Sequence, residues 1–129
     1  MDPYAVLPRE DQPARHRQRS ELYAQNKCKG RDTVLPALAP PSKKPEKLRI
    51  GYFSADFHVH PVMHLIVKML ELHDRSAFEI HGFSFGPDYD DEMRKRLVKA
   101  FDTFHDVREI PDQEIAELAR NQSIDIAID

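Results

Sequence analysis

Hydrophobic and polar positions change their period repeatedly along the chain from Leu48 onward. Short apolar and aromatic runs, such as LRIGYFS at 48–54, are typical of buried strands, and the longer amphipathic stretches between them have the period of helices. The pattern predicts strands and helices in alternation, at residues 48–54, 60–74, 78–85, 90–102, 104–107, 111–122 and 123–129. This β-α-β-α-β-α-β order predicts an α/β fold in which helices flank a Rossmann-like parallel sheet.

The helix predicted at 60–74 is amphipathic. Pro61 occupies its first turn, where a proline is tolerated because the N–H that it lacks has no helical partner there. Five apolar residues share one predicted face, as in an amphipathic helix: Val62, Leu65, Ile66, Met69 and Leu70.

The first third of the chain has a different composition. Residues 1–33 are polar and predict a helical N-terminal extension, with a helix at about 13–27. Residues 34–47 are rich in proline, which predicts a stiff linker because proline interrupts both helices and central strands. Residues 48–129 then form the Rossmann-like lobe, which we expect to be truncated at its C-terminal end.

Composition and charge exclude several classes of protein. The net charge of the 129 residues is −3, which argues against a nucleic-acid partner because binding to phosphates needs clustered Lys and Arg. A single cysteine excludes an internal disulfide and fits a reducing compartment. The sequence has no apolar run of the roughly 20 residues that a membrane span needs and no apolar signal core at its N-terminus. We therefore expect a cytoplasmic protein with no membrane partner.

The stretch SADFHVHPVMH, at 54–64, contains three histidines. His60 directly precedes Pro61, so we expect it to cap a helix at the carboxyl end of the first strand. A helix N-terminus favours anions and disfavours positive charge, so a neutral imidazole that can accept a proton suits this position. We interpret His60 as functional. His58 and His64 are more simply a solvent-facing loop residue and a half-buried packing residue, although both could line a site.

Two metal sites are alternative interpretations. FHVHP resembles the His-x-His of metal-dependent amidohydrolases, but their barrel needs roughly 200 residues or more, and this chain has 129. Asp88-x-Asp90 resembles the metal-binding pair of one class of glycosyltransferases. We expect instead that Asp88 or Asp90 caps the second helix of the lobe, with Asp91 and Glu92 in its first turn. No glycine-rich phosphate loop is present, so we expect no cofactor site in this chain.

The last predicted strand runs to the end of the chain, where Asp129 is a weak site candidate. Ligands of parallel α/β sheets bind beyond the carboxyl ends of the strands, where the next loop lies. We therefore expect this chain to be a piece of a longer protein.

The segment 48–107 resembles the start of the catalytic region of O-linked N-acetylglucosamine transferases and their SPINDLY-type bacterial relatives. The shared pattern is L-R-[IV]-G-Y-x-S-x-D-F, a short loop, His-Pro and a helix, followed by F-E-[IV]. The final IDIAID looks like the family strand that leads into a Lys-Gly-Tyr-Thr loop. DPYAVLP and the proline-rich stretch look like the connector to a tetratricopeptide-repeat region, although no such repeat is present in this chain.

The resemblance implies part of the N-terminal lobe of a two-lobed GT-B glycosyltransferase. Such an enzyme moves a sugar, here N-acetylglucosamine, from a UDP-sugar donor to Ser or Thr of a protein acceptor, without a metal. His60 matches the family's active-site histidine, and Asp56, Phe57 and Pro61 match the same motif as structural supports. The second lobe binds most of the UDP, so the resemblance implies that this chain alone is inactive.

Two positions depart from the family pattern. Many members have Gly-Asn where this chain has His58-Val59, which changes the backbone freedom of the loop. Some members have Asn-His at the position of Asp102-Thr103, and His105 lies two residues further along, on the same face of the strand. We assign His105 no role. Two alternatives to the enzyme remain: a non-catalytic half-Rossmann interaction module, and a small metal-binding domain built on the three histidines.

Overall fold

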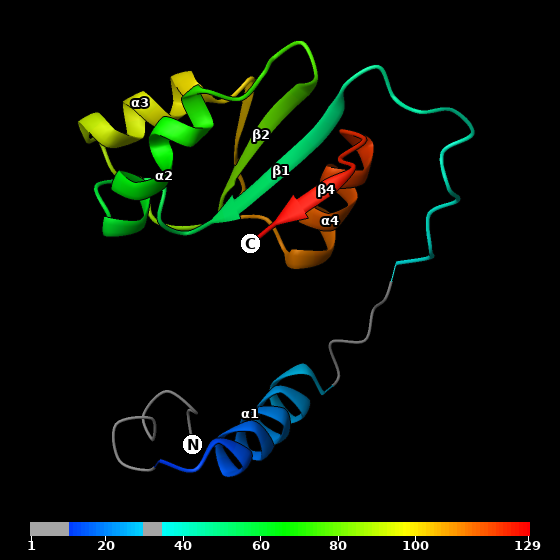
Figure 1. Ribbon diagram of the computed structural model, residues 1–129, viewed down its shortest axis with the longest axis vertical. Helices are drawn as coiled ribbons and strands as arrows, with labels where there is room; N and C mark the ends of the chain where they lie inside the picture. The colour runs from blue at the N-terminus through cyan, green and yellow to red at the C-terminus, as the bar shows by residue number, and fades with distance from the viewer. Residues whose placement is uncertain (1–10, 30–34) are drawn as a thin grey trace. The chain divides into compact units, whose positions relative to one another are not determined.

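The structure is a computed structural model that describes residues 11–29 and 35–129. The DPYAVLP segment lies outside these described residues. The chain divides into two compact units, Met1–Leu38 and Ala39–Asp129, and each is described by itself. In the first unit, α1 (Pro13–Cys28) begins with its proline in the first turn, as predicted (Figure 1). The predicted ends of the extension and the linker stay predictions.

The second unit alternates strands and helices in the predicted order. Its elements are β1 (Leu48–Ser54), α2 (Pro61–Glu71), β2 (Phe78–Ser84), α3 (Glu92–Ala100), β3 (Thr103–Asp106), α4 (Asp112–Asn121) and β4 (Ile126–Ile128). The strands form one sheet in the order β3-β2-β1-β4, and every neighbouring pair is parallel. The predicted Rossmann-like parallel sheet with flanking helices is confirmed.

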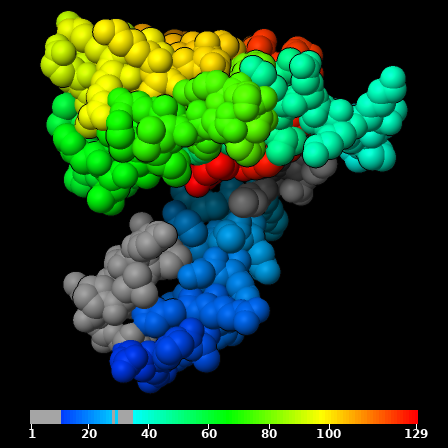
Figure 2. Space-filling model, turned by 45° about the horizontal axis from the view of Figure 1, so that its top comes forward, coloured from blue at the N-terminus to red at the C-terminus, as the bar shows by residue number. Residues whose placement is uncertain are grey.

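The main core lies between the sheet and the pair of helices α2 and α3. Figure 1 shows these two helices on one side of the sheet and α4 on the other, and Figure 2 shows α2 and α3 packed side by side. Successive side chains of a strand point to opposite faces of a sheet, so alternate residues of β1 and β2 enter this core. The buried residues of the cluster are Ile50, Tyr52, Phe57, Met63, Val67, Leu70, Ile80, Met93, Leu97, Ala100 and Phe101.

The predicted buried face of α2 is wrong in its phase. The helix buries Met63, Val67 and Leu70, whereas Leu65 is 81% exposed. Val62 and Met69 of the predicted face are also exposed. Of its five residues, only Leu70 is buried, and Ile66 is half-buried. Apolar side chains surround most of this helix, so hydrophobicity alone left two faces to choose from. Packing against the sheet and α3 decides between them.

The turn from α4 to β4 has an unusual backbone conformation. Ser123 has a φ of 55°, in the left-handed region where glycine is usual. Its N–H donates to the carbonyl of Arg120, and the N–H of Ile124 donates to the carbonyl of Ala119. This pair of hydrogen bonds is the Schellman pattern, which closes the carboxyl end of α4.

The structure also bears on membrane insertion. Among the described residues, no helix combines the length and the apolar character needed to span a bilayer.

Candidate functional site

The candidate site lies in the loop that connects the carboxyl end of β1 to α2. His60 is the N-cap of α2, with extended backbone angles of φ −144° and ψ 145°, and Pro61 follows in the first turn. The Val62 N–H donates to Nδ1 of His60 at 3.3 Å. The cap predicted from the His-Pro sequence is therefore present. It leaves the His60 side chain 34% exposed at the strand-end edge of the sheet.

Asp56 lies between the two histidines of this loop. Its Oδ2 is 3.7 Å from His60 Nδ1, and its Oδ1 is 4.0 Å from His58 Nε2. Two backbone contacts hold Asp56 in place: its N–H donates to Ser54 Oγ at 3.0 Å, and its carbonyl accepts the His58 N–H at 2.6 Å. Because both separations exceed hydrogen-bond length, Asp56 neighbours the two imidazoles without a direct hydrogen bond to either.

The other two histidines lie where the sequence did not place them. His58 is only 18% exposed, and its ring packs on Tyr89 with the ring centres 4.2 Å apart. His64 is exposed one turn along α2. The expectations of a solvent-facing His58 and a half-buried His64 are therefore both wrong. His58 is partly buried because its ring packs on Tyr89, a contact that sequence spacing does not reveal.

Phe57 ties the loop to the core. It is 1% exposed, and its ring meets the edges of Phe101 and Phe104 at centre distances of 5.3 and 5.7 Å. Aromatic rings of this size bury a large apolar area in defined geometry. Phe57 thus anchors the loop that contains His60 to the core.

A second loop, between β2 and α3, lies against the first. The Phe85 N–H donates to the carbonyl of Ser54 at 3.2 Å. A side chain at Gly86 would meet the backbone of Ala55, so the absence of a Cβ there permits the close approach of the two loops.

The acidic residues of this second loop do not form a metal site. Asp88 is 3.1 Å from Arg94, and Asp90 is 3.1 Å from Lys95. Asp91 is the N-cap of α3, so the expectation that Asp88 or Asp90 caps this helix is wrong by one to three positions. Among the residues that the structure describes, no three His, Cys, Asp or Glu side chains converge as ligands of a metal ion. Both metal alternatives therefore lack a site in this part of the chain.

Sequence reasoning missed one buried cation at this edge of the sheet. Arg94 is 8% exposed and donates to the Phe57 carbonyl at 3.3 Å and to Ser84 Oγ at 3.1 Å. Its guanidinium also lies over the ring of Phe104. The signal was present in the sequence, because Arg94 lies one turn before Leu97 on the face of α3 that also buries Met93.

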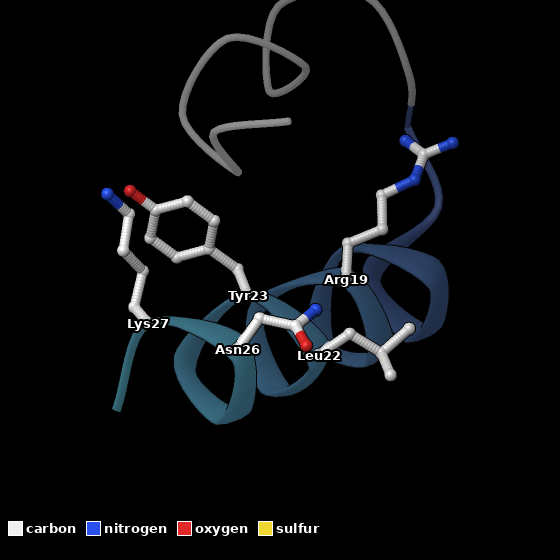
Figure 3. A pocket seen from close by; sticks show the side chains of 5 residues that line it. All are labelled: Arg19, Leu22, Tyr23, Asn26 and Lys27. Carbon is white, nitrogen blue, oxygen red and sulfur yellow. The ribbon is translucent and has the colours of Figure 1, made fainter. Parts of the chain in front are cut away.

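The surface has several hollows, and one of about 480 Å³ adjoins the second loop, where Asp88, Tyr89 and Arg94 contribute to its wall. Among the residues that the structure describes, a hollow of about 560 Å³ is lined by five side chains of α1, which Figure 3 shows: Arg19, Leu22, Tyr23, Asn26 and Lys27. Another of about 390 Å³ lies at the carboxyl ends of the strands, on the α4 side, and Phe53, Phe85 and Arg108 contribute to its wall.

Comparisons with known proteins show the family of the chain. The family model described as glycosyl transferase family 41 matches residues 33–129. The chain is 31% identical, over 73% of its length, to a probable UDP-N-acetylglucosamine–peptide N-acetylglucosaminyltransferase, SEC, from Arabidopsis thaliana. It is 30% identical, over 67% of its length, to the SPINDLY protein of the same plant, whose name states the same probable activity.

A solved structure gives the same result. A mutant of the Thermobaculum terrenum O-GlcNAc transferase superimposes with a TM-score of 0.83 and 32% identity, over 98% of this chain. The match confirms the predicted fold, which resembles part of a GT-B glycosyltransferase. The chain spans 24% of that solved chain and about a tenth of each of the two plant relatives. By the match to the family model, to these relatives and to the solved structure, the chain belongs to glycosyl transferase family 41.

Proposed function

We propose that this chain is part of a UDP-sugar-dependent protein O-glycosyltransferase, which transfers N-acetylglucosamine to Ser or Thr side chains, and that His60 lies in its active site. The observation that carries the proposal is the position of His60. It caps α2 at the carboxyl end of a parallel strand, where α/β folds bind their ligands. The names of the relatives supply the substrate class, a UDP-N-acetylglucosamine donor and a peptide acceptor.

The hydrogen bond of His60 decides what its ring offers to a substrate. A neutral imidazole that accepts the Val62 N–H at Nδ1 carries its proton on Nε2. In this conformation Nε2 is a donor, which suits contact with an oxygen of the acceptor or of the sugar diphosphate. To take a proton at Nε2, the ring must first move its own proton to Nδ1, beside the Asp56 carboxylate. That second form would give up the hydrogen bond from the Val62 N–H, because Nδ1 would then be a donor as well.

The rest of the proposed enzyme lies outside this sequence. The solved relative is about four times as long as the part that this chain matches. We propose that a second lobe binds most of the UDP-sugar. On that proposal, residues 1–129 alone show no transfer.

The test is substitution of His60 in the transferase that contains this region. With UDP-N-acetylglucosamine and Ser/Thr peptides, we expect His60→Ala to lower kcat by about 100-fold or more, the usual range for a group that handles a proton in the transition state. Lys68→Ala is the matched control, because Lys68 is 68% exposed on the same helix. An unchanged kcat/KM in His60→Ala would overturn the proposal and leave the interaction module as the better interpretation.

A further inference from the structure

The beginning of α3 holds the backbone of the His60 loop through one carboxylate. Oδ1 of Asp91 accepts the N–H of Arg94 at 2.8 Å, which is the cap of α3. Oδ2 of the same residue accepts the N–H of Val59 at 3.0 Å. These two hydrogen bonds hold the pKa of the Asp91 carboxyl below its usual range. One side chain therefore joins a helix end to the residue directly before His60.

Other contacts from the same segment hold the two residues before Val59. The Arg94 guanidinium donates to the Phe57 carbonyl, two residues before Val59. The Tyr89 ring packs on His58, one residue before Val59. The loop thus rests on the segment 88–94 at three successive residues, and Asp91 supplies the contact nearest to His60.

The backbone of Val59, directly before His60, is the point of the loop that Asp91 holds. His60 directly follows Val59, has an extended backbone and accepts the Val62 N–H at Nδ1. Val59 is 55% exposed, so little packing of its own side chain fixes this point. Its backbone is held instead: the carbonyl lies 3.0 Å from Nδ1 of His58 within the same loop, and the hydrogen bond from its N–H to Asp91 is the contact that ties it to α3.

We propose that Asp91 is a positioning residue for His60: its second oxygen fixes the Val59 amide and thereby sets where the His60 imidazole lies. The inference rests on the proposed function, because it concerns the same histidine. It does not place Asp91 in contact with substrate.

The two oxygens of Asp91 allow its two roles to be separated. In Asp91→Ser, the hydroxyl accepts the Arg94 N–H and keeps the cap of α3, since Ser is among the best N-cap residues. A single hydroxyl does not also reach the Val59 N–H. Asp91→Asn is the second variant: its one carbonyl oxygen keeps the cap, and its NH₂ group then faces the Val59 N–H, donor against donor.

In the transferase, we expect both variants to keep the melting temperature close to that of the parent and to lower kcat by about 10- to 100-fold, as misplacement of a reacting group by about 1 Å does. The KM for the UDP-sugar should change much less than kcat, because on the proposed function the second lobe binds most of the donor. Asp74→Ala is the matched control. This carboxylate also accepts a backbone N–H, that of Ser76, in the turn after α2. We expect this control to leave kcat unchanged.

A double-mutant cycle shows whether Asp91 acts through His60. We expect His60→Ala combined with Asp91→Ser to have the kcat of His60→Ala alone. If His60→Ala lowers kcat but Asp91→Ser and Asp91→Asn do not, the positioning role is overturned and the proposed function stands. If the two effects on kcat multiply, Asp91 acts independently of His60, and the inference is again overturned. If His60→Ala itself has no effect, the proposed function has failed and the inference fails with it.

Discussion

The two faces of the sheet are built in different ways. Toward α2 and α3, the strands present apolar side chains such as Ile50 and Ile80, which are 6% and 0% exposed. Toward α4, the same strands present Glu79 and His81 among aromatic rings. None of the residues of α4 is fully buried. One face is thus held by apolar burial between two helices, and the other by polar contacts and stacked rings.

The buried polar groups of the α4 face are hydrogen-bonded to one another. His81 is 1% exposed, and its Nε2 lies 2.8 Å from a Glu79 oxygen while its Nδ1 lies 3.4 Å from His105 Nε2. The hydrogen bond from His81 holds the pKa of the Glu79 carboxyl below its usual range. Phe83 stacks between Phe53, at 4.4 Å, and His105, at 4.6 Å. Burial of this histidine is tolerated because both of its ring nitrogens have partners.

The comparison predicts that the largest losses of stability come from the apolar face. Leu70 is 0% exposed in the core beneath α2. We expect Leu70→Ala to lower the free energy of unfolding by about 2–5 kcal/mol, because it removes apolar contacts and leaves a cavity. Urea unfolding of the chain, followed by circular dichroism, measures this change.

Leu65→Ala is the matched control on the same helix, since Leu65 is 81% exposed. We expect its effect to stay within about 0.5 kcal/mol. Equal losses from the two substitutions would contradict the observed phase of α2 and restore the face that the sequence suggested.

Leu65 and Leu70 also show which features could be predicted from the sequence. The order of strands and helices could be predicted because period and turn residues are local signals. His60 as a helix cap could also be predicted, since a residue before a first-turn proline has few other positions available. The phase of α2 could not, because apolar residues lie on both of its candidate faces.

Long-range contacts explain the remaining differences. The ring contact between His58 and Tyr89 joins residues 31 positions apart, and the hydrogen bond from the Val59 N–H to Asp91 joins residues 32 positions apart. Both depend on how closely the two loops approach, which the tertiary structure decides. For the same reason, the sequence did not show which of the adjacent acids Asp90, Asp91 and Glu92 caps α3.

A smaller effect is expected where the chain returns to the sheet on the α4 side. Ser123 has a φ of 55°, and a left-handed backbone costs a non-glycine residue roughly 1–2 kcal/mol. Glycine removes that cost but adds about 0.5–1 kcal/mol of conformational entropy to the unfolded chain. We therefore expect Ser123→Gly to stabilise the chain by about 0.5–1 kcal/mol. A higher midpoint of urea unfolding would show this, whereas a lower one would mean that the Ser123 side chain makes a stabilising contact.

The smallest expected effect is a pH dependence to which each face contributes one histidine. Burial lowers the pKa of His105 on the α4 face, with a further contribution from His81, and burial lowers the pKa of His73 on the other face, where Arg75 adds to it. His73 is also hydrogen-bonded to the Tyr52 hydroxyl at 2.7 Å.

Both pKa values lie below the ordinary 6.5, so the unfolded chain takes up protons first as the pH falls. The stability that these histidines contribute is complete above pH 6.5 and is lost as the pH falls from there through their folded values. We expect unfolding free energies measured between about pH 7.5 and about pH 5.5 to decrease, and His105→Asn and His73→Asn each to flatten that decrease. If His73→Asn alone flattens it, protonation of His105 costs the folded chain nothing, and the α4 face is open enough to hydrate the charge. The two faces of the sheet would then differ in how far water reaches them as well as in their polarity.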